Sequence, residues 1–322
     1  MRKSTIVWLS IGGGLIVLGA LLFVLVMSAN QWNFMKLSTE KYVTNTYEFE
    51  DAVENVRIQS KTAQIEFLKS EDGKTKVVCY ETKKCMHVTK IKDGTLSIEI
   101  NDTRKWYDYI NVFDFSTDKI TVYLPEGAYG DLNVKASVSD VRIGAGYTFQ
   151  NISVRLSTGS IHCNASAVNL LQMHTTIGDV KLTDLSAGRI DLIASTGKIT
   201  ASKIECKGEM RVEISTGDIY FTDVTCQNLI SEGDTGDLNL KNVIAQEKFD
   251  FERSTGDVKF EKCDAAELFI ETDTGSVKGS LLTEKIFIVE TDTGRIDVPK
   301  SVSGGRCEIE TDTGDVNITI QE

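Results

Sequence analysis

Proline and histidine are nearly absent from this sequence, which has two prolines and three histidines in 322 residues. The histidines, His87, His162 and His174, show no HExxH or other metal-binding spacing, so we interpret them as ordinary surface residues and predict no histidine-based metal centre. Long amphipathic helices are also lacking, whereas 25 glycines and many β-branched residues are present. This balance favours short strands that are joined by glycine turns.

Cysteines are too few and too irregularly spaced for a disulfide framework or a zinc site. The seven cysteines are an odd number and contain no CxxC spacing, which argues against both. Two pairings remain open. Cys206 and Cys226 share one phase of the repeat described below and could form a disulfide or pack as small apolar residues. Cys79 and Cys85 flank an expected hairpin and could pair across it.

Positive charge is in deficit, because the formal net charge is −12. Such a surface argues against nucleic acid or anionic lipid as the partner of the β-rich part of the chain. Cations or basic surfaces are better matched to it.

The long apolar run of the sequence lies at its N-terminus, from Ile6 to Met27, directly after Arg2 and Lys3. A helix of this length reaches roughly 33 Å, enough to cross a hydrocarbon core of about 30 Å. The alternative is a signal peptide cleaved shortly after Met27, but the run exceeds the usual length of a signal-peptide core. We therefore predict a single-pass cell-membrane protein with a cytoplasmic N-terminus and an exported β-rich domain.

A repeat of 19 or 20 residues organises the second half of the chain. Its consensus is (S/D)TG(D/S) followed by an apolar residue, and one of the nine copies, Thr176-Ile177-Gly178, is degenerate. The repeat glycines are Gly159, Gly178, Gly197, Gly217, Gly236, Gly256, Gly275, Gly294 and Gly314. We expect each to form a structural turn, where φ is positive or neighbouring units approach closely.

Apolar residues follow each repeat glycine with period two, which marks one inward face. Two short inward-facing strands per unit cannot close a core alone, but stacking the units about 4.8 Å apart buries a continuous one. The predicted fold is therefore all-β, a parallel β-solenoid of about 19–20 residues per coil and roughly 38 Å long. An antiparallel sandwich also has short, regular strands, but the constant phase over nine units disfavours it.

The predicted organisation has five parts. Residues 1–5 form the cytoplasmic N-terminus, 6–28 the transmembrane helix, 29–42 a linker, 43–135 an irregular β cap and 136–322 the solenoid. The cap is expected to cover the first open edge of the stack. The last predicted strand, near Ile320, has no evident polar cap, so we expect an exposed edge there and end-to-end self-association.

These units, and the strand from Lys119 to Pro125 that leads into them, resemble the "putative adhesin" family of bacterial β-strand-repeat proteins, a domain of unknown function. The resemblance covers nearly everything after the apolar segment. It implies a surface-exposed β domain, often preceded by a membrane segment. It implies no catalytic residue.

Acidic side chains recur at outward positions of the repeat and should stack one above another. We call this set the acidic ladder: Glu213, Asp234, Asp237, Glu252, Asp257, Glu271, Asp273, Glu290, Asp292, Glu310 and Asp312. Like charges about 4.8 Å apart repel by roughly 0.9 kcal/mol in water, so the ladder needs counter-charges. One interpretation is a strip that binds Ca²⁺. The other is a solvated acidic edge, which is favoured because the calcium-binding GGxGxDxUx nonapeptide is absent; no cofactor is then required.

We predict a non-catalytic cell-envelope protein, an adhesin or a protein-interaction scaffold at the membrane that could assist the envelope stress response. Partners would be the membrane, through the helix, and envelope proteins or polysaccharide. Alternatives are a carbohydrate-active enzyme, which would need carboxylates converging in a cleft, and a passive spacer without exposed apolar patches. An aromatic stretch could bind sugar or pack in the cap; it comprises Trp106, Tyr107, Tyr109, Phe113 and Phe115.

Overall fold

The computed structural model describes residues 3–32, 41–105 and 117–321 of the chain. One helix, α1 (Lys3–Ala29), precedes the strands. Its segment Val7–Ala29 is long and apolar enough to cross a membrane, and most of its side chains are exposed, with Met27 buried. The aromatic stretch between Trp106 and Phe115 lies outside the described residues.

Seven strands form the part of the chain before the regular repeats. They are β1 (Tyr42–Phe49), β2 (Asn55–Gln59), β3 (Gln64–Lys69), β4 (Thr75–Thr82), β5 (Cys85–Lys92), β6 (Thr95–Asp102) and β7 (Lys119–Leu124). Antiparallel pairs join β1 to β4, β4 to β7 and β5 to β6. Turns at Gly73 and Gly94 have positive φ and connect β3 to β4 and β5 to β6.

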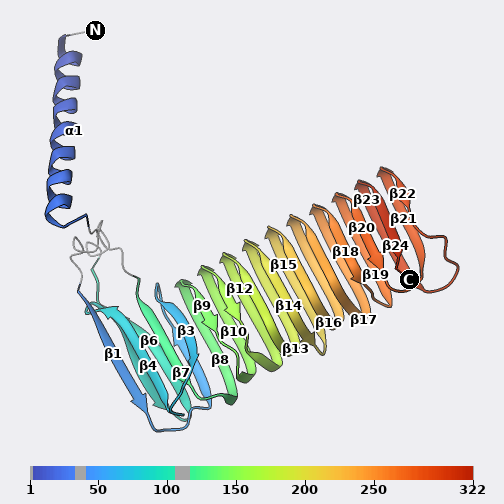
Figure 1. Ribbon diagram of the computed structural model, residues 1–322, viewed down its shortest axis with the longest axis horizontal. Coiled ribbons are helices and arrows are strands. Elements are labelled where there is room, and N and C mark those ends of the chain that lie inside the picture. Colours follow the sequence, from blue (N-terminus) through green and yellow to red (C-terminus); the bar gives the residue numbers. More distant parts are fainter. Residues whose placement is uncertain (1–2, 33–40, 106–116, 322) are drawn as a thin grey trace.

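The remaining strands stack in parallel and confirm the β-solenoid (Figure 1). They are β8 (Gly127–Val138), β9 (Val141–Ile143), β10 (Tyr147–Thr158), β11 (Ile161–Cys163), β12 (Ser166–Ile177), β13 (Val180–Thr196), β14 (Ile199–Cys206), β15 (Glu209–Thr216), β16 (Ile219–Thr235), β17 (Leu238–Thr255), β18 (Val258–Cys263), β19 (Glu267–Thr274), β20 (Val277–Leu281), β21 (Lys285–Thr293), β22 (Ile296–Asp297), β23 (Gly305–Thr313) and β24 (Val316–Ile320).

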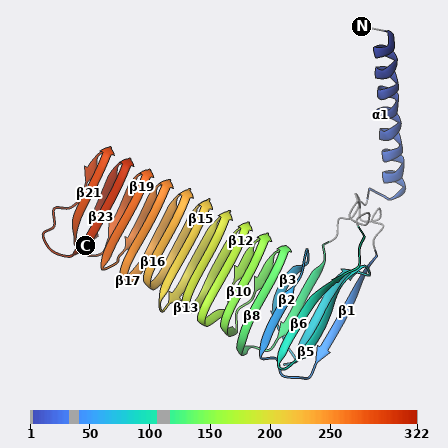
Figure 2. The same cartoon turned by 180° about the vertical axis from the view of Figure 1, so that it is seen from behind.

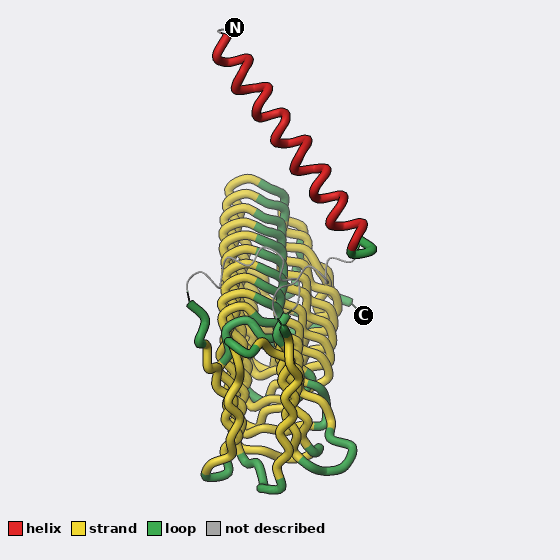
Figure 3. The backbone as a smooth tube through the Cα atoms, turned by 90° about the vertical axis from the view of Figure 1, so that its left-hand side faces the viewer, coloured by secondary structure: helices red, strands yellow, loops and turns green. Residues whose placement is uncertain are grey.

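Two parallel layers of strands enclose the core, and their turns align in strips along the stack (Figure 3). The position two residues after each repeat glycine points inward. The residues there are fully buried from Ile161 to Val277, as the period-two pattern requires. Aromatic pairs such as Phe249 and Phe251, whose ring centroids lie 5.1 Å apart, fill the wider parts of the core.

One corner of each coil was not anticipated from the sequence. Five residues with φ between 52° and 55° bend the strand that follows the glycine, and each lies six positions after a repeat glycine: Asp184, Lys203, Asp223, Asn242 and Lys262. Asparagine and aspartate tolerate this left-handed conformation better than other non-glycine residues. All five lie at the same position of the repeat, which could have indicated a bend there. Because the residue types at this position differ, the sequence shows no recognisable turn motif.

The order of the last coils differs from their order in the sequence. Strand β23 pairs with β19 on one side and with β21 on the other. Likewise β24 lies between β20 and β22. The C-terminal coil is therefore inserted into the stack, and the expectation of an exposed edge near Ile320 is wrong. The strands β21 and β22 instead end the stack, far from the cap (Figure 1). We call this pair of strands the open end.

The N-terminal strands are inserted in the same way. Strand β2 pairs with β6 and β8, and β3 pairs with β7 and β9. The segment 55–69 thus forms a coil of the solenoid, between the cap and the first regular repeat. The cap covers this end of the stack with antiparallel strands.

All seven cysteines are buried and free, including Cys79, Cys85, Cys206 and Cys226. Both open pairings are thus resolved in favour of packing. The interpretation of His87 as a surface residue is wrong, because His87 is 2% exposed and lies inside the cap. Sequence spacing could not show this, since the side-chain partners of the His87 ring, Ser60 and Glu81, come from two separate segments of the chain.

Candidate interaction surfaces

The nine repeat glycines form one column along the stack. At Gly217, a Cβ atom would lie 1.7 Å from the carbonyl oxygen of Gly197 in the preceding coil, and φ is 136°. Comparable contacts of 1.9–2.1 Å recur at the other repeat glycines. The coils approach too closely here for any side chain, so the column is a structural turn and leaves no space for a ligand.

Aspartates that follow the glycine column hydrogen-bond to the next coil. The Asp218 carboxylate accepts the backbone N–H of Asp237 at 3.0 Å, and Asp237 accepts that of Asp257 at 3.0 Å. Asp257 accepts the N–H of Ser276 at 2.9 Å. Asp218 and the acidic-ladder members Asp237 and Asp257 therefore accept hydrogen bonds from the turn backbone, as short polar side chains commonly do.

Basic side chains neutralise part of the acidic ladder. Lys259 Nζ lies 2.9 Å from Asp237 and 3.0 Å from Asp257. Burial raises the pKa of Asp257, but the Ser276 N–H and Lys259 outweigh it, and the net pKa lies below the usual value. These contacts therefore stabilise the fold above about pH 4 and are lost as the carboxyl group takes up a proton below it. Glu213 is paired with Arg211 at 2.7 Å.

The other eight members of the acidic ladder are exposed: Asp234, Glu252, Glu271, Asp273, Glu290, Asp292, Glu310 and Asp312. The inserted coil changes their order, because Glu310 lies between Glu271 and Glu290. Within the described ranges, no three carboxylates of the ladder bring their oxygens within 4.8 Å of one another. The solvated acidic edge, favoured over the Ca²⁺-binding strip in the sequence analysis, stays a prediction.

We expect millimolar Ca²⁺ to change the melting temperature of the protein by less than about 1 °C relative to EDTA. A site filled at 100 times its dissociation constant would add about 2.7 kcal/mol and raise the melting temperature by several degrees. The ladder oxygens lack the convergence that six to eight Ca²⁺ ligands require. Calorimetry with Mg²⁺ as the matched control checks this. A rise of several degrees with Ca²⁺ alone would establish the calcium strip instead.

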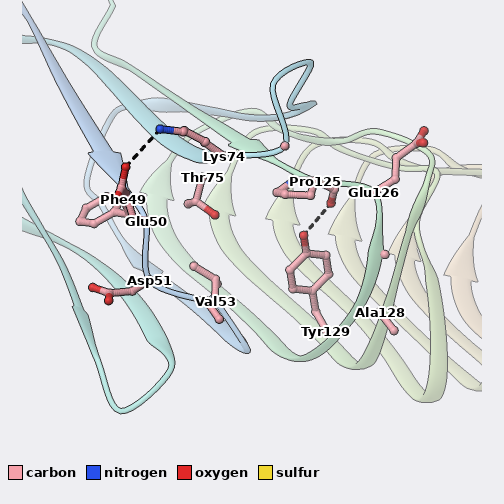
Figure 4. A pocket seen from close by; sticks show the side chains of 13 residues that line it. Phe49, Glu50, Asp51, Val53, Lys74, Thr75, Pro125, Glu126, Ala128 and Tyr129 are labelled. Atoms are coloured by element: carbon pink, nitrogen blue, oxygen red, sulfur yellow. Dashed lines mark hydrogen bonds and ion pairs between the residues drawn. The ribbon is translucent and has the colours of Figure 1, made fainter.

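A hollow of about 430 Å³ lies where the cap meets the solenoid (Figure 4). Two of its three acidic residues form ion pairs, Glu50 with Lys74 at 3.2 Å and Glu126 with Lys69 at 2.8 Å. The third, Asp51, is exposed. Tyr129 donates its hydroxyl hydrogen to a backbone carbonyl. A glycosidase needs one carboxyl group to donate a proton and a second to act as base or nucleophile, and ion pairs of this kind disfavour both roles.

The open end exposes apolar side chains that other coils bury. Ile296 is 47% exposed, although the equivalent residues Val277 and Val316 are fully buried. Ile286 and Ile288 on β21 are exposed too, at 44% and 49%, but they lie on the outward face, level with Arg306 and Glu308 of the neighbouring coil. Among the described strands, β21 pairs only with β23 and β22 only with β24. Unpaired backbone groups beside exposed apolar residues are typical of an edge that accepts another strand.

The comparisons with known proteins point to one family. The sequence profile of the Toastrack DUF4097 family matches residues 53–220 and 199–322. A comparison with curated proteins found no match.

Several crystal structures are similar to this chain. A putative adhesin from Bacteroides fragilis is 16% identical, covers 88% of this chain and 99% of its own, and gives a TM-score of 0.39. A putative adhesin from Parabacteroides distasonis is 12% identical, with coverages of 88% and 98% and a TM-score of 0.41. A putative lipid binding protein from the same species is 14% identical, with coverages of 86% and 96% and a TM-score of 0.32.

Proposed function

Because the chain belongs to the Toastrack DUF4097 family and carries an N-terminal apolar helix, we propose that it is a non-catalytic, membrane-anchored surface protein that binds through the open end of its solenoid. The helix anchors the chain, with Arg2 and Lys3 on the cytoplasmic side. The cap follows the helix in the chain, and the open end lies at the opposite end of the stack (Figure 1).

The main observation that supports this proposal is the exposure of Ile296. It distinguishes the open end from a passive spacer, for which the last coil should be covered or polar. Phe287 and Val289 on β21 are also only partly buried, although they continue the apolar core. Covering these side chains would extend the core by one more coil and remove their apolar surface from water.

The partner that fits this edge is a second copy of the chain. Two β21 strands related by a two-fold axis would pair in antiparallel fashion, the symmetry that most homodimers adopt. In the register centred on Val289, Glu290 lies opposite Ile288. In the same register Asp292 lies opposite Ile286. No two like charges then face each other, which removes the usual penalty for pairing acidic strands.

End-to-end contact between copies on facing membranes would make the protein a homophilic adhesin. The shape supports this role, since a rigid stack separates the cap from the open end (Figure 2). The short turns between coils build no walls for a deep cleft, so the carbohydrate-active enzyme is the less supported alternative.

We expect Ile296→Lys to weaken self-association of the full chain by at least about tenfold, that is about 1.4 kcal/mol, because it places a charge in the apolar contact. Sedimentation velocity in detergent, compared with the wild-type chain, measures this. Val168→Lys is the matched control, since Val168 is 50% exposed on β12 in the middle of the stack. Bacteria displaying the wild-type protein should aggregate, and those displaying Ile296→Lys should not. Equal association of both variants, or a monomeric wild type, would contradict the proposal.

A further inference from the structure

A cluster of three metal-ligating side chains lies inside the cap, away from the open end. Ligand atoms of Cys79, Glu81 and His87 all lie within 4.8 Å of one another. Cys79 and Glu81 are fully buried, and His87 is 2% exposed. Among the residues that the structure describes, this is the one group of three or more such side chains at this spacing.

The two strands that carry the cluster separate into different layers. Cys79 and Glu81 are two residues apart on β4, so they share its inward face. Strand β4 pairs with β1 and β7, whereas β5, which carries His87, pairs along its length with β6. His87 therefore approaches the Glu81 carboxylate from the other side of the hairpin, and its Nδ1 lies 2.8 Å from Glu81 Oε2.

Neighbouring groups hold both side chains in position. The Asn45 amide donates to Glu81 Oε1 at 2.7 Å, and the backbone N–H of His87 donates to Oε2 at 2.6 Å. Ser60 Oγ lies 3.1 Å from His87 Nε2 and can fix the ring tautomer. Outer hydrogen bonds of this kind orient the histidine and carboxylate ligands in protein metal sites.

We propose that Cys79, Glu81 and His87 bind one divalent transition-metal ion, with Zn²⁺ the best match to one sulfur, one oxygen and one nitrogen ligand. Zinc accepts all three ligand types in a tetrahedral arrangement, and three protein ligands leave its fourth position for water. Burial raises the pKa of the Cys79 thiol to about 12, so the thiol is protonated in the metal-free protein. Metal binding would displace this proton and the hydrogen shared between His87 and Glu81, and would release them to solvent.

The Cys79 sulfur atom distinguishes a metal site from a cluster that only stabilises the fold. A buried Glu81–His87 hydrogen bond needs no third partner, and a neutral thiol would add only packing. A bound metal ion instead makes Cys79 a thiolate ligand. The exposed acidic ladder can bind cations weakly, but it contains no sulfur, so a sulfur signal reports this cluster alone.

The full chain, in detergent and freed of metal with EDTA, is titrated with Co²⁺ and then with Zn²⁺. We expect one Co²⁺ per chain, with a thiolate-to-cobalt charge-transfer band that Zn²⁺ abolishes. Cys79→Ser should remove the band and weaken Zn²⁺ binding by about 100-fold or more. Cys163→Ser, at an equally buried cysteine on β11 of the solenoid, should retain both.

A second variant, His87→Gln, keeps a polar side chain of similar size and also loses tight binding. Circular dichroism of each variant verifies that the β structure is intact. Absence of the charge-transfer band in the wild-type protein would overturn the proposal. The same band in Cys79→Ser would also overturn it, because another cysteine would then be the ligand.

Discussion

Gly217→Ala is expected to destabilise the solenoid by about 3 kcal/mol or more. The added methyl carbon would lie 1.7 Å from the carbonyl oxygen of Gly197 and 3.2 Å from the Ile214 side chain. Neither backbone can move away freely, because each coil is hydrogen-bonded to a coil on either side. The positive φ of 136° adds backbone strain for any residue other than glycine.

Urea unfolding of the full chain in detergent, followed by circular dichroism, measures this loss. Ser215→Ala is the matched control, because Ser215 lies two residues earlier in the same turn and is exposed. Its effect should stay within about 0.5 kcal/mol. If the two variants unfold at the same urea concentration, the coils do not approach each other at the glycine column as closely as the structure indicates.

Val316→Asp should destabilise the protein by more than about 3 kcal/mol, whereas Ile296→Asp should cost less than about 1 kcal/mol. Both residues lie two positions after a repeat glycine. Val316 is fully buried because its strand lies between β20 and β22. Ile296 is 47% exposed at the open end, so a carboxylate there keeps much of its hydration.

This pair of variants discriminates between the two coil orders. If the coils stacked in sequence order, Ile296 would be interior and Val316 would lie in the last coil, so the ranking would be reversed. Thermal unfolding of both variants beside the wild-type chain gives the ranking directly. Hydrogen exchange adds a local measure, because Val316→Asp should also release the amides of β21, whose neighbouring strand β23 belongs to the disrupted coil.

The coil itself could be predicted from the sequence because each repeat glycine and the apolar residue after it obey one constant period. The period indicates which residues occupy equivalent positions in successive coils. From it the turns and the inward face could be predicted, and the repeated motif indicated the family. It does not report which coil lies beside which. The units around Gly275, Gly294 and Gly314 share the segment ETDTG, so this motif alone allows either of the last two units to stack on the Gly275 unit.

The metal-ligating cluster was missed for a different reason. His87 and Glu81 are six residues apart, a spacing that matches no known metal-binding motif. The two side chains meet because β4 and β5 belong to different layers of the cap. The polar partners Asn45 and Ser60 are further away in sequence. Convergence of this kind comes from the irregular cap, where no repeat fixes the register. The acidic ladder differs from this cluster. Its regular spacing could be read from the sequence, but the stacked carboxylates do not converge on one point.

The insertion of the last coil between two earlier ones also determines when the solenoid can be completed. Residues 285–297 leave the ribosome before residues 305–320, yet their final neighbours are β23 and β24. During synthesis, the chain can stack its coils one after another only as far as β20. The next coil must then wait undocked, or release a provisional contact with β19, until the C-terminal segment arrives. The proposed binding end is thus completed only after β23 and β24 have been synthesised, which would keep partly synthesised chains from pairing prematurely.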